Sequence, residues 1–409
     1  MATGFMVMGL ISTSGINLTG LFVKPIAEAF EVPRTMAATA MSISSLSSML
    51  ACLVAGKIIA RFGIKRVVAI CIVTITLCCV VVATAPSFTV VIIAMVVRGL
   101  CNALGVMLPT STLINNWFGA RIRGRVMGFT MMGTGIGAII LSPIIGHMIE
   151  NLGWRMAYGF FGVLALVCLP PVLLTYALHP QDKGLRPLGE VDPGEGVAPA
   201  PPDRSGISGK TAVRSLLFWL FIPGVFLTVG GIQVWLVNGA AYLTDFGFDV
   251  IWVSYVLSLT SMALTVGKPL VGAISDRVGT RNAIYFSSAM LVSGYILSIF
   301  VGRWQPLTYL MAIVIGLGQA TTTVLLPLLT RDLFGNKDYV TLNGFMQSAQ
   351  GFSYFLIPIL ASAVFEWTGS YVPAWLGVCG CVAVGLTLVT IAYRLQPKLM
   401  ARAGAPEHP

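Results

Sequence analysis

The stretch RVVAICIVTITLCCVVVATA, residues 66–85, has no charged side chain after its first position. Twenty helical residues span about 30 Å, which is the thickness of the hydrocarbon core of a bilayer. Similar stretches recur about twelve times along the 409 residues, and the chain is 56% hydrophobic and only 10% charged. That composition lies outside the range of soluble globular domains. The sequence therefore predicts an integral membrane protein.

The apolar stretches predict twelve membrane spans. Each must be helical, because backbone groups facing lipid are satisfied only within a helix or a closed barrel, and unbroken apolar runs do not alternate as barrel strands do. We therefore expect an all-α membrane protein built from two pseudo-symmetric six-helix bundles. The expected spans are residues 4–29, 37–58, 66–85, 88–115, 126–149, 155–178, 216–243, 250–274, 282–302, 306–330, 344–365 and 372–394.

The distribution of lysine and arginine predicts the orientation. With both termini in the cytoplasm, the inner connections hold nineteen basic residues and the outer ends hold four, Lys24, Arg34, Arg155 and Arg303. Such an excess is typical of cytoplasmic loops. It also accounts for most of the net charge of +10 without a nucleic-acid partner. We expect a multi-pass protein of the cell's inner membrane.

The cysteines indicate no covalent framework. All eight lie within expected spans, where thiols pack as small apolar side chains. Their spacing suggests neither disulfides nor a metal site, and no cofactor is expected. The first apolar run lacks a basic leader and a cleavage site, so we interpret it as a retained span.

One polar segment divides the chain. It covers residues 179–215, and its run GEVDPGEGVAPAPPDRSGISGK at 189–210 has the Pro-rich and Gly-rich composition of a flexible linker. We therefore expect an N-terminal bundle at 1–178, a cytoplasmic linker at 179–215, a C-terminal bundle at 216–395 and a cytoplasmic tail at 396–409.

The sequences on the two sides of this segment repeat at a shift of about 216 residues. Several matches in register indicate a duplicated six-helix unit. GKIIARFGIKR at 56–66 returns as GAISDRVGTRN at 272–282, SGIN at 14–17 as GGIQ at 230–233, and WFG at 117–119 as LFG at 333–335.

In these loops the chain resembles the major facilitator superfamily. The family's loop after the second span of each half has Gly, three residues, Asp, Arg, one residue, Gly, one residue and then basic residues. The second half matches with Gly272, Asp276, Arg277, Gly279 and Arg281. The first half matches with Gly56, Arg61, Gly63, Lys65 and Arg66, but has Ala60 in place of Asp.

The resemblance implies a gating role for these loop residues. An acid at a helix end beside basic residues can form charge pairs that hold one access state closed. The loss of one acid at Ala60 should weaken that contact in the first half. The alternative is that the charges only set the topology.

Two longer stretches resemble the branch that contains monocarboxylate transporters and oxalate–formate exchangers. They are LFVKPIAEAFEVPRTMAATAMSI at 21–43 and NNWFGARIRGRVMG at 115–128, the latter followed by Gly133, Gly135 and Gly137. These three glycines lie in a membrane helix without a preceding strand. We expect them to be close-packing positions and not a phosphate loop.

Two basic residues lie well inside expected spans, where a charge costs about 2.5 to 3.5 kcal/mol on the insertion scale. Lys268 in VGKPLVG stands where, by resemblance, this branch carries its substrate-binding arginine, and we expect it to hold a carboxylate. The alternative is a lysine that reaches the inner interface. Arg98 either contacts substrate or is a structural charge satisfied by backbone carbonyls and by Asn102.

Polar side chains in the spans expected to line a cavity complete the candidate binding site. They can hydrogen-bond to a hydroxy or keto group beside the carboxylate, and the alternative for each is a contact between helices. They are Asn17, Asn102, Gln233, Asn238, Gln319, Gln350 and Tyr354.

Carboxylates are absent from the middle of every span. All fifteen acidic residues lie in connections or at span ends. By resemblance, proton-coupled transporters of this branch have an Asp where this chain has Leu264, and oxalate exchangers have a lysine where it has Gln350. The first departure favours anion exchange or facilitated diffusion over proton symport. The second favours a single carboxylate, because another buried charge would stay unpaired.

These features together predict a monomeric transporter, not an enzyme, that moves a small organic anion such as a monocarboxylate by alternating access. Membrane lipid is its other expected partner. Two alternatives stay open, namely efflux of an amphipathic drug-like solute and a transporter-like metabolite sensor. An enzyme is disfavoured because the polar residues form no nucleophile with a base, no metal-ligand cluster and no nucleotide loop.

Overall fold

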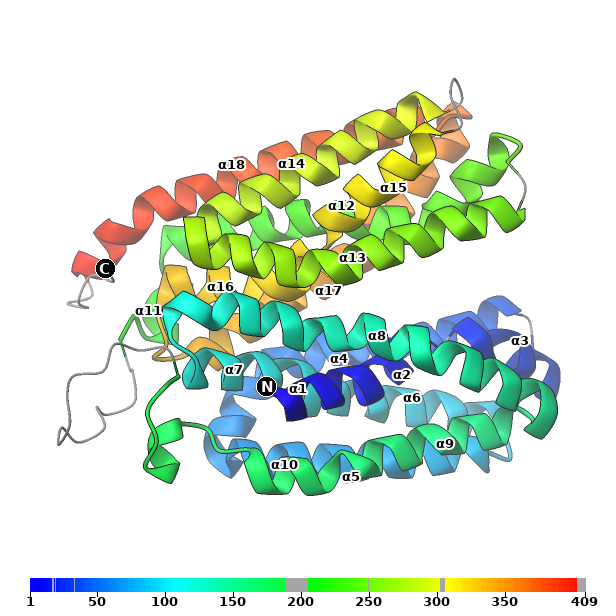
Figure 1. Ribbon diagram of the computed structural model, residues 1–409, viewed down its shortest axis with the longest axis horizontal. Helices are drawn as coiled ribbons and strands as arrows, with labels where there is room; N and C mark the ends of the chain where they lie inside the picture. Colours follow the sequence, from blue (N-terminus) through cyan, green and yellow to red (C-terminus); the bar gives the residue numbers. More distant parts are fainter. Residues whose placement is uncertain are drawn as a thin grey trace. The chain divides into compact units, whose positions relative to one another are not determined.

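The structure is a computed structural model that describes residues 1–16, 18, 20–32, 34–188, 205–248, 250–301 and 306–402. Within these ranges every regular element is a helix, and the extended pairing amounts to two isolated bridges. Eleven of the described helices are long and apolar enough to cross a membrane (Figure 1). The predicted all-α membrane fold is confirmed. The expected first span at 4–29 is divided among shorter helices and includes residues 17 and 19, which lie outside the described ranges.

The chain forms two compact units, which we describe separately. Unit 1 comprises Met1–Gly119 and Phe129–Pro202, and unit 2 comprises Ala120–Gly128 and Asp203–Pro409. The long helix α8 (Ala120–Leu152) therefore contributes its first turns to unit 2 and the remainder to unit 1.

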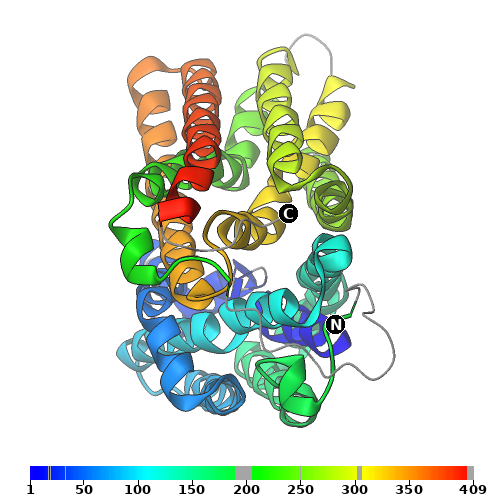
Figure 2. The ribbon, with the colours of Figure 1, turned by 90° about the vertical axis from the view of Figure 1, so that its left-hand side faces the viewer.

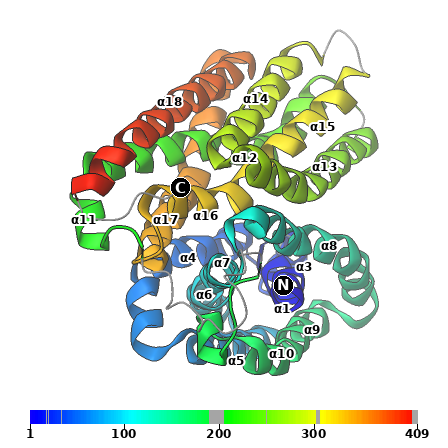
Figure 3. The ribbon, with the colours of Figure 1, turned by 60° about the vertical axis from the view of Figure 1, so that its left-hand side comes forward.

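Unit 1 is a bundle in which α5 packs against α6 and α9, while α4 packs against α6. Figure 3 shows α1 surrounded, in that view, by α7, α8 and α9. Besides most of α8 and the short η3 (Pro180–Lys183), its helices are α1 (Ala2–Val7), η1 (Met8–Ser12), α2 (Thr13–Ile16), α3 (Gly20–Ala29), α4 (Arg34–Phe62), α5 (Ile64–Ala83), α6 (Phe88–Asn102), η2 (Ala103–Met107), α7 (Leu108–Trp117), α9 (Trp154–Val167) and α10 (Leu169–Thr175).

Unit 2 is a second bundle, in which α12 packs against α17 and α18, and α13 packs against α15 (Figure 2). Its core includes a cluster of aromatic rings, with Trp375 next to Tyr242, Tyr295 and Tyr371. Its helices are α11 (Gly209–Val213), α12 (Leu216–Asp245), α13 (Val250–Val278), α14 (Thr280–Ile299), α15 (Leu307–Gln319), α16 (Thr321–Phe334), α17 (Tyr339–Thr368) and α18 (Val372–Arg402).

Many helices extend beyond the apolar runs that predicted them. The helix expected at 126–149 is α8, Ala120–Leu152, and the last one runs to Arg402 instead of ending at 394. Hydropathy detects only the part of a helix inside hydrocarbon, whereas backbone hydrogen bonding continues through the polar ends. The expected tail at 396–409 therefore begins as part of α18.

The repeated loop glycines have matching backbone conformations. Gly63 separates α4 from α5 with φ +78°, and Gly279 separates α13 from α14 with φ +88°. Side chains rarely adopt this left-handed region, which glycine enters without cost. The same tight break therefore ends the second helix of each repeat.

Both ends of the expected linker are bound to equivalent loops. In unit 1, Leu188 exchanges two 2.9 Å backbone hydrogen bonds with the WFG loop, through Trp117 and Gly119. In unit 2, Ile207 donates to the Phe334 carbonyl at 3.0 Å, and the Asp338 carboxylate accepts from the amide of Gly209 at 2.6 Å. The flexible-linker interpretation therefore does not hold for these ends.

Two of the three α8 glycines predicted to pack closely, Gly133 and Gly137, do so. A Cβ added at Gly133 would lie 2.5 Å from the carbonyl oxygen of Phe5, and one added at Gly137 would lie 2.8 Å from the Thr13 hydroxyl. The Thr13 hydroxyl in turn donates to the Thr134 carbonyl at 2.9 Å. Small residues thus let α8 approach the backbone of the first span, as in other membrane helix pairs.

We expect Gly137→Ala to destabilise the protein by about 1 to 3 kcal/mol, because the added methyl group has no room against the first span. The matched control is Gly146→Ala on the same helix, since a Cβ there meets nothing within 4 Å. Thermal unfolding midpoints in detergent, followed by size-exclusion chromatography, should fall for the first variant only. Equal midpoints would contradict this packing.

Candidate functional site

Arg98 of α6 is the centre of a buried polar site in unit 1. Only 3% of the residue is exposed. Its guanidinium donates hydrogen bonds to the Tyr158 hydroxyl of α9 at 2.9 Å and to the Ser14 hydroxyl of α2 at 2.8 Å. It also lies 5.7 Å from the centroid of the Tyr158 ring, within the range of a cation–π contact. Three helices therefore hold this cation.

The guanidinium has no acidic partner among the described residues. Both of its hydrogen-bond acceptors are neutral hydroxyls. A guanidinium carries five N–H donors, of which these hydroxyls engage two. A buried charge without a counter-ion is costly.

Of the two alternatives for Arg98, the one in which Asn102 and backbone carbonyls satisfy the charge names the wrong partners. The Asn102 side-chain oxygen is buried without a hydrogen-bond partner among the described residues. Ser14, which lies in the repeated SGIN motif, and Tyr158 take that role. No signal in the sequence pointed to Tyr158, because its helix meets α6 only in the folded bundle.

Two π-helical turns flank the Arg98 site. η1 ends at Ser12, two residues before Ser14, and η2 begins at Ala103, directly after Asn102. The two π-turns contact each other. A π-turn inserts an extra residue into the helix, redirects the side chains around it and often marks a functional position. Here the two turns flank the residues that surround the cation.

Lys268 is the buried cation of unit 2. It is 4% exposed and lies on α13 between Gly267, which packs against Leu317 and Ala320, and Pro269. The proline has no N–H, so the helix loses its hydrogen bond to the carbonyl of residue 265 at this point. Lys268 is thus enclosed by protein beside a break in the helical hydrogen bonding.

Asp276 of α13 binds the first turns of α8 within unit 2. Its carboxylate, with 2% of the side chain exposed, accepts hydrogen bonds from the backbone amides of Gly124 at 2.6 Å and Arg125 at 2.8 Å. The side chain of Arg125 adds an ion pair at 3.5 Å. Charge-assisted bonds of this kind are about twice as strong as neutral ones.

The same face of α13 carries Lys268, Gly272 and Asp276 at intervals of four residues, which places them one above another. A Cβ on Gly272 would collide with the Gly124 backbone, and a Cβ on Gly128 would collide with the Lys268 carbonyl. The contact between α8 and α13 therefore extends from the Asp276 carboxylate to the backbone of Lys268.

The other loop residues predicted to gate do not join this contact. Arg277 is exposed, and exposed Arg281 donates to the Tyr285 hydroxyl at 3.0 Å. In the first half, Arg61 lies over the Phe62 ring at 5.5 Å, and Ala60 is exposed. Gly56 is buried within α4. The charge pair expected for Asp276 thus comes from the RIRGR segment of α8.

The remaining polar candidates are distributed over unit 2. Gln350 donates to Tyr354 one turn along α17 at 3.1 Å, and both are half-buried, as is Gln233. Gln319 donates to the Ile232 carbonyl at 3.4 Å, and its buried side-chain oxygen has no partner in the described ranges. Asn238 accepts from Ser362 at 2.8 Å as an interhelical contact. Asn17 lies outside the described residues.

Comparison with known proteins identifies the family. The sequence matches the family described as Major Facilitator Superfamily over residues 5–304 and 242–408. The chain belongs to the Major Facilitator Superfamily. It is therefore a multi-pass membrane transporter and not an enzyme.

Several curated facilitators are similar at low identity. The 3-(3-hydroxy-phenyl)propionate transporter of Escherichia coli (strain K12) is 25% identical over 323 residues, or 75% of this chain and 76% of that protein. Monocarboxylate transporter 12-B of Danio rerio is 25% identical over 67% of this chain and 62% of its own length. Niacin transporter NiaP of Acinetobacter baylyi is 23% identical over 62% of each. The matches with the last two thus span about three fifths of those proteins.

Solved facilitator structures share the fold. FucP in the outward conformation superposes with a TM-score of 0.74 at 12% identity, covering 96% of this chain and 98% of FucP. The proton:xylose symporter XylE gives 0.68 at 13% identity, with 98% and 97% covered. The predicted facilitator fold is confirmed, and the similarity to monocarboxylate transporters supports the predicted branch.

We expect Asp276→Asn to lower the thermal midpoint of this facilitator, because an amide accepts the α8 N–H groups more weakly and cannot pair with Arg125. The loss should be about 1 to 3 kcal/mol. The control, Asp245→Asn, changes an exposed carboxylate at the end of α12. A midpoint unchanged by both substitutions would show that the contact contributes little.

Proposed function

We propose that this facilitator transports a small organic anion with one carboxylate group, and that Arg98 binds that carboxylate. The observation that carries the proposal is a cation, 3% exposed, whose hydrogen-bond partners are neutral. A carboxylate would supply the missing counter-charge and accept two parallel N–H bonds from the planar guanidinium. Ser14 and Tyr158 orient that guanidinium.

The π-turns support the same position. A site built on η1 and η2 can rearrange by returning a turn to the α-helical register, since a π-turn is one residue wider than an α-turn. Discontinuous helices at a substrate site are a recurrent feature of transporters that work by alternating access. The two turns would let the first and fourth spans change shape around a bound anion.

Lys268, which the sequence analysis placed first for holding the carboxylate, is the other candidate for binding the anion. Its ammonium is a point charge, so it attracts a carboxylate without fixing its plane. Because its backbone abuts Gly128 one turn from the Gly124–Gly272 contact, an anion at Lys268 would act on the same helix pair that Asp276 holds. We propose that this α8–α13 contact opens and closes during transport.

Anion exchange is the favoured mechanism. Asp276 is a carboxylate within a candidate span of the described residues, and 2% of its side chain is exposed. It already accepts hydrogen bonds from α8. Position 264, where a proton-binding acid would be expected, holds half-buried Leu264. His147, another titratable group, is exposed and contacts Asn151. Without an acid to carry a proton, a substrate anion on the return step would balance the charge.

The choice of a monoanion rests on Gln350 and on the relatives. Gln350 is neutral and hydrogen-bonded to Tyr354, so it supplies no charge for a second carboxylate. Two of the similar proteins are named for 3-(3-hydroxy-phenyl)propionate and niacin, each of which carries one carboxyl group.

We also propose that the protein is a monomer in the inner membrane, with bundles at 1–178 and 216–395 and with both termini in the cytoplasm.

Exchange can be measured in proteoliposomes with radiolabelled lactate outside and buffer, lactate, formate or oxalate inside, with and without a pH gradient. We expect internal lactate or formate to accelerate uptake, oxalate to do so less, and the gradient to have no effect. Gradient-driven uptake into buffer-loaded vesicles would instead establish proton coupling. Transport of amphipathic drugs that ignores lactate and formate would support efflux, and binding without uptake would support a sensor.

The binding assignments predict that Arg98→Gln and Lys268→Ala abolish saturable uptake, because each removes a buried cation from a carboxylate's reach. Lys210→Ala, which removes an exposed lysine from α11, serves as the matched control and should transport normally. Membrane insertion and monodispersity are measured for all three. Normal uptake by Arg98→Gln would overturn the central assignment.

A further inference from the structure

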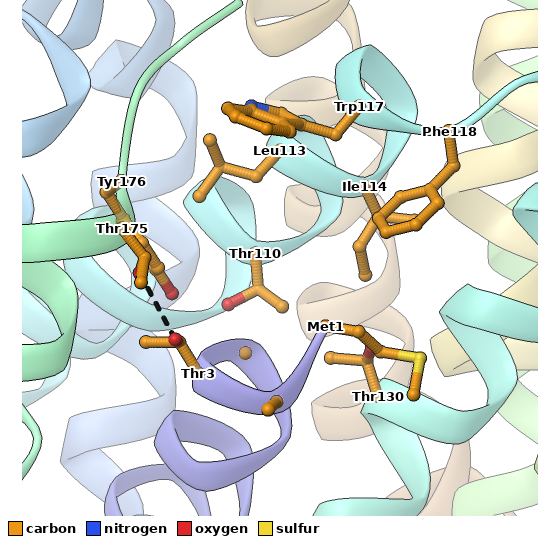
Figure 4. A pocket seen from close by; sticks show the side chains of 12 residues that line it. Met1, Thr3, Thr110, Leu113, Ile114, Trp117, Phe118, Thr130, Thr175 and Tyr176 are labelled. Carbon is orange, nitrogen blue, oxygen red and sulfur yellow. Dashed lines mark hydrogen bonds between the residues drawn. The ribbon is translucent and has the colours of Figure 1, made fainter. Parts of the chain in front are cut away.

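Two features of unit 1 lie outside the Arg98 site. The first is a pocket of about 320 Å³ beside α7, shown in Figure 4. Its wall combines the apolar side chains of Leu113 and Ile114 with Met1, which brings the charged α-amino group, so the lining does not select one class of ligand. The second feature is the loop between α4 and α5, where charge of one sign is concentrated.

The α4–α5 loop carries four basic residues and no acidic residue between positions 56 and 66. All four are exposed, and we call them the basic cluster: Lys57, Arg61, Lys65 and Arg66. None of them forms an ion pair or a side-chain hydrogen bond with a described residue, although Arg61 lies over the exposed Phe62 ring. The loop joins two candidate membrane spans, which places this uncompensated charge at the surface of the bilayer.

The equivalent loop of the second half has less excess charge. At a shift of 216 residues, Ala60 corresponds to Asp276 and Arg61 corresponds to Arg277. The segment 272–282 holds two basic residues together with that one acid. Both loops have the same glycine break, so the break itself does not require the larger charge of the first loop. The basic cluster therefore needs an explanation of its own.

The exposed side of α4 continues from the basic cluster along the membrane span. Leu46, Leu50 and Val54 are 48%, 53% and 47% exposed. They precede Lys57 and Arg61 at successive intervals of three or four residues, so all five lie on one side of the helix. An apolar strip that ends in cations matches the chemistry of an anionic phospholipid, whose acyl chains adjoin a charged phosphate.

We propose that the basic cluster binds the headgroup of an anionic phospholipid, whose acyl chains lie along the exposed side of α4. Basic clusters of this size next to a membrane helix attract such lipids electrostatically. Arg61 and Arg66 can each bind a phosphate through paired N–H groups. The first turn of α5 has no side-chain cap, and its free amides favour a phosphate as well. A zwitterionic lipid gains less, because the same cations repel its choline group.

Native mass spectrometry of the full, delipidated chain can compare palmitoyl-oleoyl phosphatidylglycerol with the phosphatidylcholine that has the same acyl chains. We expect the phosphatidylglycerol to bind about fivefold or more tightly. Lys57→Gln with Arg61→Gln should weaken its binding about tenfold or more, because two of the four charges are lost. The matched control is Lys210→Gln with Arg214→Gln, which removes an exposed lysine and arginine with the same spacing at α11 and should leave this binding unchanged.

Position 60 provides a test that removes no basic residue. Ala60→Asp places a carboxylate one helical turn from Lys57 and next to Arg61, so the counter-charge would come from the protein itself. This change should weaken phosphatidylglycerol binding about fivefold. Ala60→Asn has nearly the same shape without the charge and should bind the lipid as the natural chain does. Ala60 is exposed, so both variants should keep the thermal midpoint of the natural chain.

Equal binding of the two lipids would overturn the proposal. Phosphatidylglycerol binding that is unchanged in the Lys57–Arg61 variant and in Ala60→Asp would also overturn it, as would an equal loss in the Lys210–Arg214 variant. Displacement of the lipid by an equal concentration of sn-glycerol 3-phosphate would count against it too, because the site would then recognise phosphate without acyl chains. These measurements use no transported anion, so their outcome is independent of the role proposed for Arg98.

Discussion

The cost of placing charge inside an apolar bundle constrains this protein more than any other interaction. Arg98 and Lys268 are 3% and 4% exposed in a chain whose acids avoid the middle of its spans. Arg98 is stabilised by a ring face and two hydroxyls, which keep its charge in place without neutralising it. A carboxylate partner would have made a more stable bundle and removed the attraction for an anion. Unit 1 therefore holds a buried positive charge to which the proposed anion would supply the counter-charge.

The second constraint is how closely helix backbones approach each other. Helices in lipid gain little from apolar burial against one another, so close contact and hydrogen bonds must hold them. α8 meets this need twice, with Gly133 and Gly137 against the first span and with Gly124 and Gly128 against α13. Asp276 adds polar bonds only to the second contact. One helix thus combines a contact that includes a neutral hydroxyl–carbonyl hydrogen bond with a contact that includes charge-assisted bonds to a carboxylate.

Sequence reasoning recovered the features that depend on local chemistry. Each span satisfies its own backbone, so hydropathy located the helices, and the burial of Arg98 followed from its place in an apolar run. The partners of Arg98 could not be found in this way, because Ser14 and Tyr158 lie 84 and 60 residues away in sequence. Asn102 was chosen wrongly as a neighbour one turn along the same helix. The π-turns left no pattern in hydropathy, and the residues that Asp276 binds are about 150 positions distant.

The attachment of the segment between the bundles has a consequence for engineering. The WFG loop holds Leu188, which follows its bundle, while the equivalent LFG loop holds Ile207, which precedes its own. Both loops bind this segment mainly through backbone hydrogen bonds, which do not depend on the side chains of the segment. Leu188 is thus bound within unit 1, and Ile207 is bound within unit 2. Proline at Leu188 or Ile207 would therefore remove the N–H that makes the attachment, whereas other side chains at these two positions would keep it.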